Sequence, residues 1–506
     1  MSWFSVERGT QPIYSQVKNR IKELICQGVL PAGTKIPSSR ALARTLGVSR
    51  NSVLEAYELL RSEGVLESNG RVGTYVSTQC GKGTFLPSGR GEPSSETRGL
   101  DAMWERALSA SVSALLEASP RISQPAQDHR TVVLSDLVPA FDRMSAERFR
   151  TCLNYVLAND PHRLLGYGDV EGYTPLREWI ASYMTDRGVA TSIDEVLIVG
   201  GFQQGLTLVC SSFLNPGDKV FIENPGYPGT LASLLYADAQ VEGIPLTSSG
   251  VDVKLIRELA TRSKPRMVCV TPLWQNPTGI TLDVDTRKGI LACAADLGLI
   301  VVEDGFTDEL CYSGRLIPPL KAEDRSRNVI YIGTMSKILF PGIRVGWLVA
   351  PRPAVRALAA SKRAADRCCS PILQAACYEF CRQGYLKSHI ARMRRLYSRR
   401  RDAMAQALAK HMPPDVTYHV SEGGMSAWVT LPEDIDSREL HGEARAAGVL
   451  FVPGTRFFIN GGGEHNLRLT YCSCSERAID QGMKILGDLI RKKLCRVGRP
   501  SERYGA

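Results

Sequence analysis

Apolar residues recur along residues 131–490 in two alternating patterns, short continuous runs and longer amphipathic stretches. The continuous runs are rich in β-branched residues. They predict strands at EVLIVG (195–200), KVFIENP (219–225), RMVCVTP (266–272), LIVVED (299–304), NVIYIG (328–333) and VGWLVA (345–350). Strands that are apolar throughout are buried on both faces, so their alternation with helices predicts an α/β fold with a mostly parallel sheet.

A helix-rich pattern occupies residues 1–77. The first predicted helix has one apolar stripe, formed by Ile13, Val17, Ile21, Leu24 and Ile25. The stretch PAGTKIPSS then breaks the chain, and Ser38 or Ser39 is placed to cap the next helix. SRALARTLGVSRNSVLEAYELLRSEGVL predicts a helix, a tight turn at Gly47 and a second helix. Two short strands around Asn69 and Gly70 follow as a wing.

The residues between and after these two regions are polar. Residues 78–130 contain QCGKGTFLPSGRGEPSSETRG, whose Gly, Ser and Pro content predicts a linker. Within the linker, residues 100–119 have helical spacing, and we expect them to pack against a neighbouring element. Residues 491–506 carry six bases against one acid and are expected to form a disordered basic tail. The predicted domains are therefore 1–77 and 131–490, joined by a linker and followed by a tail.

Composition narrows the class of protein. A chain of 506 residues favours two or more domains, and 43% apolar with 23% charged residues is typical of soluble globular proteins. No apolar run is long enough for a membrane span, and the first residues do not form a signal peptide, so we expect a cytoplasmic protein. The 14 cysteines lack disulfide-framework or metal-site spacing, which favours reduced thiols and no metal. The net charge of +10 hints at a polyanionic partner.

The helix-turn-helix pattern suggests that this partner is DNA. Such domains lay the start of their second helix in the major groove, where Ser49, Arg50 and Asn51 would meet base edges. The arginines expected to meet phosphates or a minor groove are Arg40, Arg44 and Arg71. The same geometry also occurs in proteins that never touch DNA. However, residues 12–76 resemble the winged helix-turn-helix of the GntR family along nearly their whole length, most specifically in PSSRALARTLGVSRNSV. This resemblance implies that the partner is promoter DNA.

Chemically distinctive residues of the larger region follow predicted strands, where open α/β sheets hold ligands. VGGFQQG (199–205) is a strand-to-helix turn whose backbone N–H groups at Phe202 and Gln203 suit a phosphate. Asn276 lies in a Pro-flanked turn, Asp304 ends a strand, and Lys337 follows another strand in GTMSK.

Arg344 completes this set as a permanently charged donor suited to a phosphate dianion. A lysine for a Schiff base, an acid for a ring nitrogen, an amide and phosphate donors are what pyridoxal 5′-phosphate requires. Taken singly, each residue has an ordinary explanation, such as a helix cap, a turn or a surface ion pair. The order and spacing of the set carry the prediction of this cofactor.

Residues 134–489 resemble fold-type I aminotransferases. The matching stretches are YGDVEGYTPLRE, GGFQQGL, ENPGYPG, QNPTG, VVEDGF, GTMSKILFPGIRVGW and NLRLTY. The resemblance implies that Lys337 is the Schiff-base lysine and that Asp304 pairs with the pyridinium nitrogen. It implies that Asn276 meets the phenolic oxygen of the cofactor and that Tyr227 stacks on its ring. The residues implied around the phosphate are Phe202, Gln203, Thr334 and Arg344.

Three further residues bear on assembly, effector binding and chemistry. The resemblance implies that Tyr167 reaches the phosphate of the partner subunit's cofactor, which requires a dimer. It implies that Arg468 grips an α-carboxylate as a bidentate pair. Such proteins usually have Tyr two positions after the acidic residue, whereas this chain has Phe306. Loss of that hydroxyl predicts altered tuning of the cofactor and puts efficient transamination in doubt. Alternatively, a neighbouring residue supplies the hydroxyl, or the alignment is off by a position.

Together the two regions resemble the MocR subfamily of transcriptional regulators over nearly the whole chain. The resemblance implies a head-to-tail homodimer that binds promoter DNA and senses an amine or amino-acid effector, or pyridoxal phosphate itself, through Lys337. Two alternatives stay open: an active aminotransferase with an appended DNA-binding domain, and a regulator that has lost the cofactor. Retention of Lys337, Asp304, Asn276 and Arg344 disfavours the last. We find no residue in the sequence that selects the effector.

Overall fold

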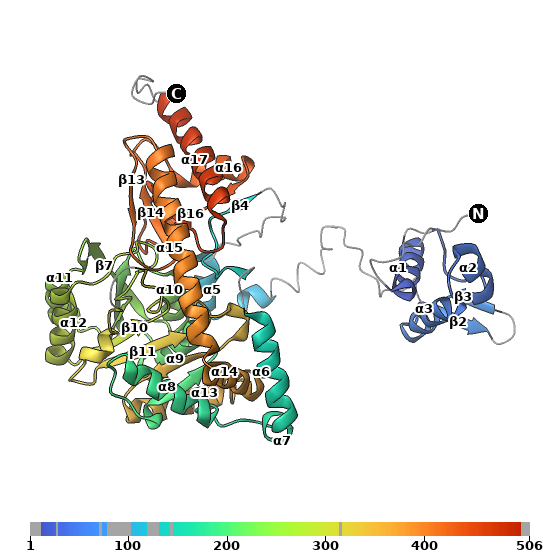
Figure 1. Cartoon of the computed structure of the whole chain (residues 1–506), viewed down its shortest axis with the longest axis horizontal. Helices are drawn as coiled ribbons and strands as arrows, with labels where there is room; N and C mark the ends of the chain where they lie inside the picture. The colour runs from blue at the N-terminus through green and yellow to red at the C-terminus, as the bar shows by residue number, and fades with distance from the viewer. Residues whose placement is uncertain are drawn as a thin grey trace. The chain divides into compact units, whose positions relative to one another are not determined.

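The computed structural model describes residues 12–26, 29–69, 73–77, 103–118, 131–141, 145–312 and 316–496. The chain divides into two compact units, Met1–Ala107 and Leu108–Ala506 (Figure 1). Each unit has hydrophobic cores of its own.

The first unit is a helical domain with a small sheet. Its elements, within the described ranges, are α1 (Ile13–Cys26), β1 (Lys35–Ile36), α2 (Ser39–Leu46), α3 (Arg50–Ser62), β2 (Leu66–Asn69) and β3 (Gly73–Val76). The strands are antiparallel in the order β1-β3-β2. Val17 and Ile21 of the predicted stripe are fully buried in the core that α3 shares. Ser38 caps α2 by accepting from the N–H of Ala41 at 3.3 Å, and Gly47 ends α2 at a φ of +66°, which glycine adopts readily. The predicted winged helix-turn-helix is confirmed.

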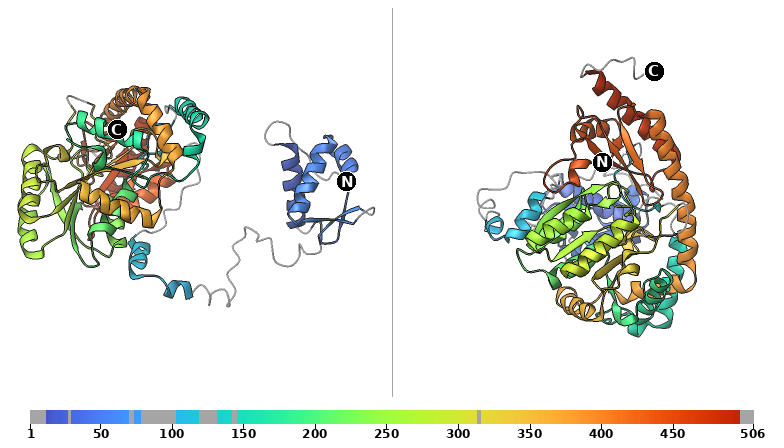
Figure 2. Two further views of the ribbon diagram at one scale, coloured as in Figure 1. Left: turned by 90° about the horizontal axis from the view of Figure 1, so that it is seen from below. Right: turned by 90° about the vertical axis from the view of Figure 1, so that its left-hand side faces the viewer.

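The second unit is built on a large mixed sheet (Figure 2). The strand order, for the part of the chain that is described, is β5-β12-β11-β10-β9-β6-β7-β8. The strands are β5 (Val196–Val199), β6 (Lys219–Asn224), β7 (Gln240–Thr247), β8 (Gly250–Val251), β9 (Met267–Val270), β10 (Ile300–Asp304), β11 (Val329–Thr334) and β12 (Gly346–Val349). Neighbours from β11 to β7 run parallel, whereas β12 and β8 run antiparallel to the strands beside them. The predicted α/β fold with a mostly parallel sheet is confirmed.

Helices cover both faces of this sheet. The side chains of β5 point alternately to the two faces. Val196 and Ile198 are buried in one hydrophobic core, whereas Leu197 and Val199 are buried in another. The first core includes α6 (Ala146–Asn159), α7 (Pro161–Leu164), α8 (Thr174–Asp186) and α14 (Pro371–Arg382). The second includes α9 (Phe202–Phe213), α10 (Pro228–Tyr236) and α13 (Arg352–Ala365), and a further core lies beneath α11 (Val253–Ser263) and α12 (Val284–Leu297).

The C-terminal part of the second unit forms its own layer. Strands β13 (Thr417–Val420), β14 (Ser426–Thr430), β16 (Val452–Pro453) and β17 (Asn466–Thr470) form an antiparallel sheet in the order β13-β14-β17-β16. The long helix α15 (Tyr385–His411) packs beside α17 (Glu476–Arg496), and α16 (Ser437–Ala446) lies near both β16 and α17. Strand β4 (Val132–Val133) pairs in parallel with β15 (Val449–Leu450). The short helical turns are η3 (Ile193–Glu195), η4 (Leu320–Glu323), η5 (Pro341–Ile343) and η6 (Gly454–Arg456).

Two polar segments differ from simple coil. Helix α5 (Ala110–Ala118), inside the predicted linker, contacts α10, so the expected packing of this stretch is confirmed. Helix α17 continues to Arg496, so the first six residues of the predicted tail are helical rather than disordered; residues 497–506 lie outside the described ranges. Most described cysteines are buried, and all of those described in side-chain detail are free thiols. In the described ranges no helix has the length and apolar character of a membrane span.

Candidate functional site

The parallel strands bring the predicted site residues to one edge of the sheet. Asp304 ends β10, and Lys337 lies in the turn after β11, its hydrogen-bonded neighbour. Asn276 lies in the loop after β9, on the other side of β10. The carboxyl ends of parallel strands meet at the same edge, which is where such sheets bind ligands.

Lys337 has a largely buried amine that forms one hydrogen bond to a backbone oxygen. Its Nζ donates to the backbone oxygen of Leu137 at 2.6 Å. Burial lowers the pKa of Lys337 to about 8, and the positive charge of Arg468 acts in the same direction, while Asp304 opposes them. A lysine with this pKa has a far larger neutral, nucleophilic fraction near neutral pH than an ordinary lysine.

Asp304 is a buried carboxyl, only 8% exposed. One hydrogen bond reaches it from the described residues, from the N–H of Phe306 to Oδ1 at 3.1 Å. Burial raises the pKa of Asp304 well above its ordinary value, and the nearby carboxyl of Asp308 adds to the effect. A buried acid in this state favours a cationic partner.

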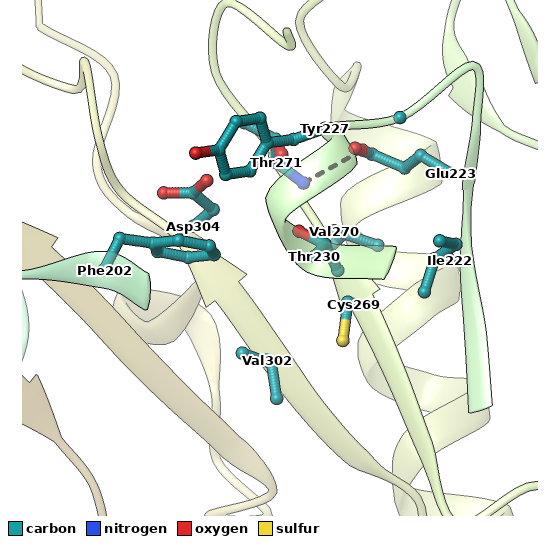
Figure 3. Close-up of a pocket in the computed structure, with 11 residues that line it drawn as sticks. Phe202, Ile222, Glu223, Tyr227, Thr230, Cys269, Val270, Thr271, Val302 and Asp304 are labelled. Carbon is teal, nitrogen blue, oxygen red and sulfur yellow. Dashed lines mark hydrogen bonds between the residues drawn. The ribbon is translucent and has the colours of Figure 1, made fainter. Parts of the chain in front are cut away.

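An aromatic ring stands over this acid. Figure 3 shows the ring of Tyr227 on one side of an open recess of about 300 Å³, with Asp304 and Phe202 at its edge. Tyr227 precedes the first turn of α10, and its ring meets that of Phe202 edge to face at 6.0 Å. Glu223 closes the far wall and accepts from the N–H of Thr271 at 2.9 Å. The recess is therefore bounded by the ring of Tyr227 and by the carboxyl groups of Asp304 and Glu223.

The turn before α9 brings backbone N–H groups and an arginine together. Gly201 has a φ of +118°, and a Cβ there would lie 3.0 Å from Nη2 of Arg344, so the guanidinium sits directly over the turn. The first N–H groups of α9, at Phe202 and Gln203, lack helical acceptors because they open the helix. The side chain of Gln203 is engaged elsewhere, donating to the oxygen of Gly229 at 2.8 Å. Thr334, buried, accepts from the N–H of Ser336 at 3.1 Å.

Arg468 projects from β17 into the same site. Its Nη1 donates to Oδ1 of Asn276 at 3.0 Å and its Nη2 to the oxygen of Ser135 at 2.7 Å, while Nε has no hydrogen-bond partner among the described residues. The guanidinium also lies over the ring of Phe457 at 5.1 Å. Burial lowers the pKa of Arg468 to about 10 because desolvation disfavours the charged guanidinium, while Tyr227 and Asp136 act in the opposite direction.

Two of the residues singled out in the sequence, Tyr167 and Phe306, do not place a polar side chain in the recess. Tyr167 is 80% exposed, with the guanidinium of Arg367 over its ring at 4.4 Å, and it does not line the recess of its own chain. Phe306 is buried beside the acid, and its backbone N–H rather than its side chain bonds Asp304. The altered tuning expected from Phe306 stays a prediction.

Sequence reasoning missed the loop that supplies acceptors to the site. The oxygens of Leu137 and Ser135 hold Lys337 and Arg468, although they lie about 200 and 333 positions away along the chain. Backbone carbonyls carry no residue-type signal, so no motif could have revealed them. Cys269 and Thr230, which line the recess, were also missed for want of a distinctive spacing.

The first unit carries the predicted DNA-contacting residues at the start of α3. Ser49 caps this helix by accepting from the N–H of Ser52 at 3.1 Å. The exposed residues of the predicted set are Arg40, Arg44, Ser49, Arg50 and Asn51. Arg71 lies outside the described residues. An exposed arginine and asparagine at a capped helix start suit readout of guanine and adenine edges.

Replacing Arg50 by Ala is expected to weaken sequence-specific DNA binding by about 1–3 kcal/mol, because a bidentate contact to a base is lost. Fluorescence anisotropy with a promoter fragment measures the change. Replacing Arg20, which pairs with Glu23 on α1, is the matched control and should leave affinity nearly unchanged. Binding that is insensitive to salt would contradict a DNA interface here, since phosphate contacts release counterions.

Comparison with known proteins identifies both units. Residues 122–486 match the family model "Aminotransferase class I and II", and residues 13–76 match "Bacterial regulatory proteins, gntR family". Over 94% of its length the chain is 30% identical to a probable rhizopine catabolism regulatory protein MocR of Rhizobium meliloti, covering 93% of that protein. Over 94% of its length it is 32% identical to the HTH-type transcriptional regulator TauR of Rhodobacter capsulatus, covering 96%.

A solved structure of an enzyme is also similar to the second unit. It is LysN, the α-aminoadipate aminotransferase of Thermus thermophilus, complexed with N-(5′-phosphopyridoxyl)-L-leucine. The similarity has a TM-score of 0.70 at 30% identity and spans 78% of this chain and 99% of the enzyme.

Proposed function

Because the chain belongs to the aminotransferase class I and II family and carries a GntR-type domain before it, we propose that it is a pyridoxal 5′-phosphate-dependent transcriptional regulator of the MocR kind. It binds promoter DNA through its winged helix and senses an amine or amino-acid effector, or the cofactor itself, at Lys337. The supporting observation is that the relatives named as regulators align with 94% of the chain, including both units. A bacterial regulator of this kind would act in the cytoplasm, where the promoters of bacteria lie.

The residues of the site fit pyridoxal 5′-phosphate. Among the described residues no cation forms a hydrogen bond or ion pair with the buried carboxyl of Asp304, although the charge of Lys337 lies near enough to act on it, and a protonated pyridine nitrogen would provide such a partner. The turn at Gly201 has a φ of +118°, which favours glycine, and it brings the guanidinium of Arg344 beside the first N–H groups of α9, an arrangement suited to a phosphate. The unpartnered Nε of Arg468 leaves that side chain with unused donor capacity toward a carboxylate.

When bound, the cofactor supplies an aldehyde that reacts with primary amines and a ring that withdraws electrons. Lys337 would hold it covalently, and the lowered pKa of Lys337 keeps part of its amine neutral for that purpose. Asp304 would hold the ring nitrogen in its protonated state, and Tyr227 would cover one face of the ring. Arg344 would fix the phosphate, leaving Arg468 to orient the carboxylate of an incoming amino acid.

The competing function is an active aminotransferase, favoured by the similarity to LysN. Purified protein should be mixed with a panel of amino acids and keto acids while cofactor absorbance and product are followed. A regulator is expected to show spectral shifts that alter DNA binding without appreciable steady-state turnover. Sustained turnover, with DNA binding indifferent to the same amino acids, would assign the chain to the enzymes.

The exposure of Tyr167 supports a head-to-tail homodimer. A tyrosine that is 80% exposed and carries a stacked arginine is available to a second copy. In the dimer, Tyr167 reaches the phosphate of the cofactor in the partner subunit. Two DNA readers on one dimer raise affinity for repeated half-sites through effective concentration.

Helix α5 offers a route from the effector site to the DNA reader. It belongs to the segment that tethers the first unit, and it packs on α10, whose first turn follows Tyr227. Val112 and Leu115 form its half-buried stripe, whereas Leu116 is 61% exposed. An effector that displaces Tyr227 can therefore bias the seating of α5, the first long helix after the DNA-binding unit in the described part of the chain.

Replacing Leu115 by Asp is expected to unseat α5, because a charge in a half-buried apolar contact costs free energy. Cofactor absorbance should persist. The factor by which the effector changes DNA affinity, about 5–150-fold for a typical coupling between two sites, should shrink at least about threefold. Leu116→Asp is the matched control on the exposed side. Equal effector responses in both variants would show that α5 does not transmit the effector response.

A further inference from the structure

A second recess lies beside the first, on the other side of the start of α10. It is a shallow, open recess that shares Ile222, Gly226 and Tyr227 with the first recess. Its outer wall comes from the C-terminal layer, through η6 and the residues that follow it: Arg456, Phe457, Phe458 and Ile459. The two recesses are therefore neighbours on either side of these shared wall residues.

The wall that carries Arg456 is fixed in place. The N–H of Gly226 donates to the oxygen of Phe457 at 2.9 Å, and the N–H of Ile459 donates to Oδ1 of Asn224 at 3.3 Å. Gly454, which opens η6, has no room for a side chain, because a Cβ there would lie 2.5 Å from the oxygen of Gly463. Arg456 is thus presented from a backbone held on both sides.

Arg456 itself is half-buried in mostly apolar surroundings. Leu231, Phe458 and Ile459 line the recess around it, and the lining contains no acid. Within the described residues, no hydrogen bond, ion pair or ring contact of its guanidinium is formed. A permanently charged guanidinium without a carboxylate, in a partly desolvated recess, is suited to an anionic ligand group.

Two arginines therefore lie close to Phe457, one over its ring and one beside it in the chain. Arg468 lies over the Phe457 ring and faces Asn276, while Arg456 precedes Phe457 and faces the second recess. One guanidinium suits an α-carboxylate, which leaves the other for an acidic side chain. We propose that the effector is an amino acid whose side chain ends in a second anionic group, held by Arg456 while Arg468 holds the α-carboxylate. This inference rests on the proposed function and narrows the class of effector.

The test uses the full-length protein loaded with cofactor, titrated with L-glutamate and with its neutral near-isostere L-glutamine while cofactor absorbance is recorded. Wild-type protein is expected to respond to glutamate at a concentration about 10–100-fold below that for glutamine, the range set by one desolvated charge-assisted contact. L-Aspartate and L-asparagine repeat the comparison for a shorter side chain.

Arg456→Met keeps the apolar stem of the side chain but removes the charge. It is expected to abolish the preference by raising the half-saturating concentration of glutamate, with that of glutamine changing less than about twofold. Arg456→Lys should recover part of the preference, since the charge returns without the planar fork. Arg445→Met, at an exposed arginine on α16, is the control and should behave as wild type. Unchanged cofactor absorbance and melting curves show that each variant is folded.

The two ways of failing are distinct. Equal responses of wild-type protein to glutamate and glutamine, or a preference that survives in Arg456→Met, would overturn the role of Arg456 while leaving a cofactor-dependent sensor intact. Absence of a bound-cofactor band in wild-type protein, or of a spectral response to any amine, would overturn the proposed function and the effector class with it.

Discussion

Replacing Lys337 by Ala is expected to abolish covalent capture of pyridoxal 5′-phosphate and every effector-dependent change in DNA affinity. Lys337 supplies the primary amine of the site from the turn after β11, where it donates to the oxygen of Leu137. Noncovalent contacts at Arg344 and Asp304 would still retain some cofactor. We therefore expect weaker binding with an altered visible spectrum rather than complete loss of the ligand.

Three measurements check this prediction. Visible absorbance reports the bound cofactor, borohydride reduction followed by mass spectrometry reports covalent attachment, and anisotropy with promoter DNA reports the effector response. Lys254→Ala, at an exposed lysine of α11, is the control and should leave all three unchanged. If Lys337→Ala kept both the wild-type absorbance and the effector response, the lysine would have no role in sensing.

The lowered pKa of Lys337 adds a pH signature to the same experiment. Because only the neutral amine attacks an aldehyde, capture of cofactor by the apo-protein should accelerate as pH rises. The rise should level off near pH 8, the pKa of the buried lysine, rather than near its ordinary value of 10.5. Raising the polarity around Lys337 would shift that plateau toward higher pH, since burial is the main cause of the depression.

The sequence allowed the local architecture to be predicted because its signals are local. The cap at Ser38, the turn at Gly47 and the apolar stripe through Val17 and Ile21 each depend on residues close by in the sequence. The first unit has all three features. The strands of the large sheet were equally visible as apolar runs. Since parallel strands share an edge, the positions of Asp304 and Lys337 after β10 and β11 already implied that these residues meet.

The remaining features depend on contacts between distant segments. The loop that holds Lys337 and Arg468 acts through carbonyl oxygens, which any residue type could provide. The recess at Arg456 forms only when η6 packs on the start of α10, and the seating of α5 on α10 likewise has no signature in either helix alone. The helical start of the predicted tail shows that charge alone does not decide order, because α17 buries Leu494 within that segment.

Replacing Arg187 by Met is expected to destabilise the second unit by about 3–5 kcal/mol, the usual effect of leaving a buried charge without its partner. Arg187 ends α8 and binds Asp308 at 3.3 Å as well as Glu309, and all three side chains are at most 10% exposed. Glu309 also accepts from Arg394 of α15, so this network fixes the turn that follows Asp304. Urea unfolding of the apo-protein measures the loss, and cofactor affinity should fall with it because Phe306, at the start of this turn, donates its N–H to Asp304.

The pH dependence of that loss separates a charge effect from a packing effect. Burial raises the pKa of Asp308 while Arg187 counteracts it, so removing Arg187 raises that pKa further above the value in the unfolded chain. A buried acid of this kind destabilises the fold when ionised, and protonation relieves it. The deficit of Arg187→Met should therefore shrink as the pH falls and Asp308 becomes protonated. Adding Asp308→Asn should recover part of the stability, because it removes the charge left unpaired.

Arg262→Met, which breaks the exposed pair with Glu258, is the control and should cost at most about 0.5 kcal/mol. A deficit that ignores pH and the second substitution would locate the effect in lost packing around α8 instead.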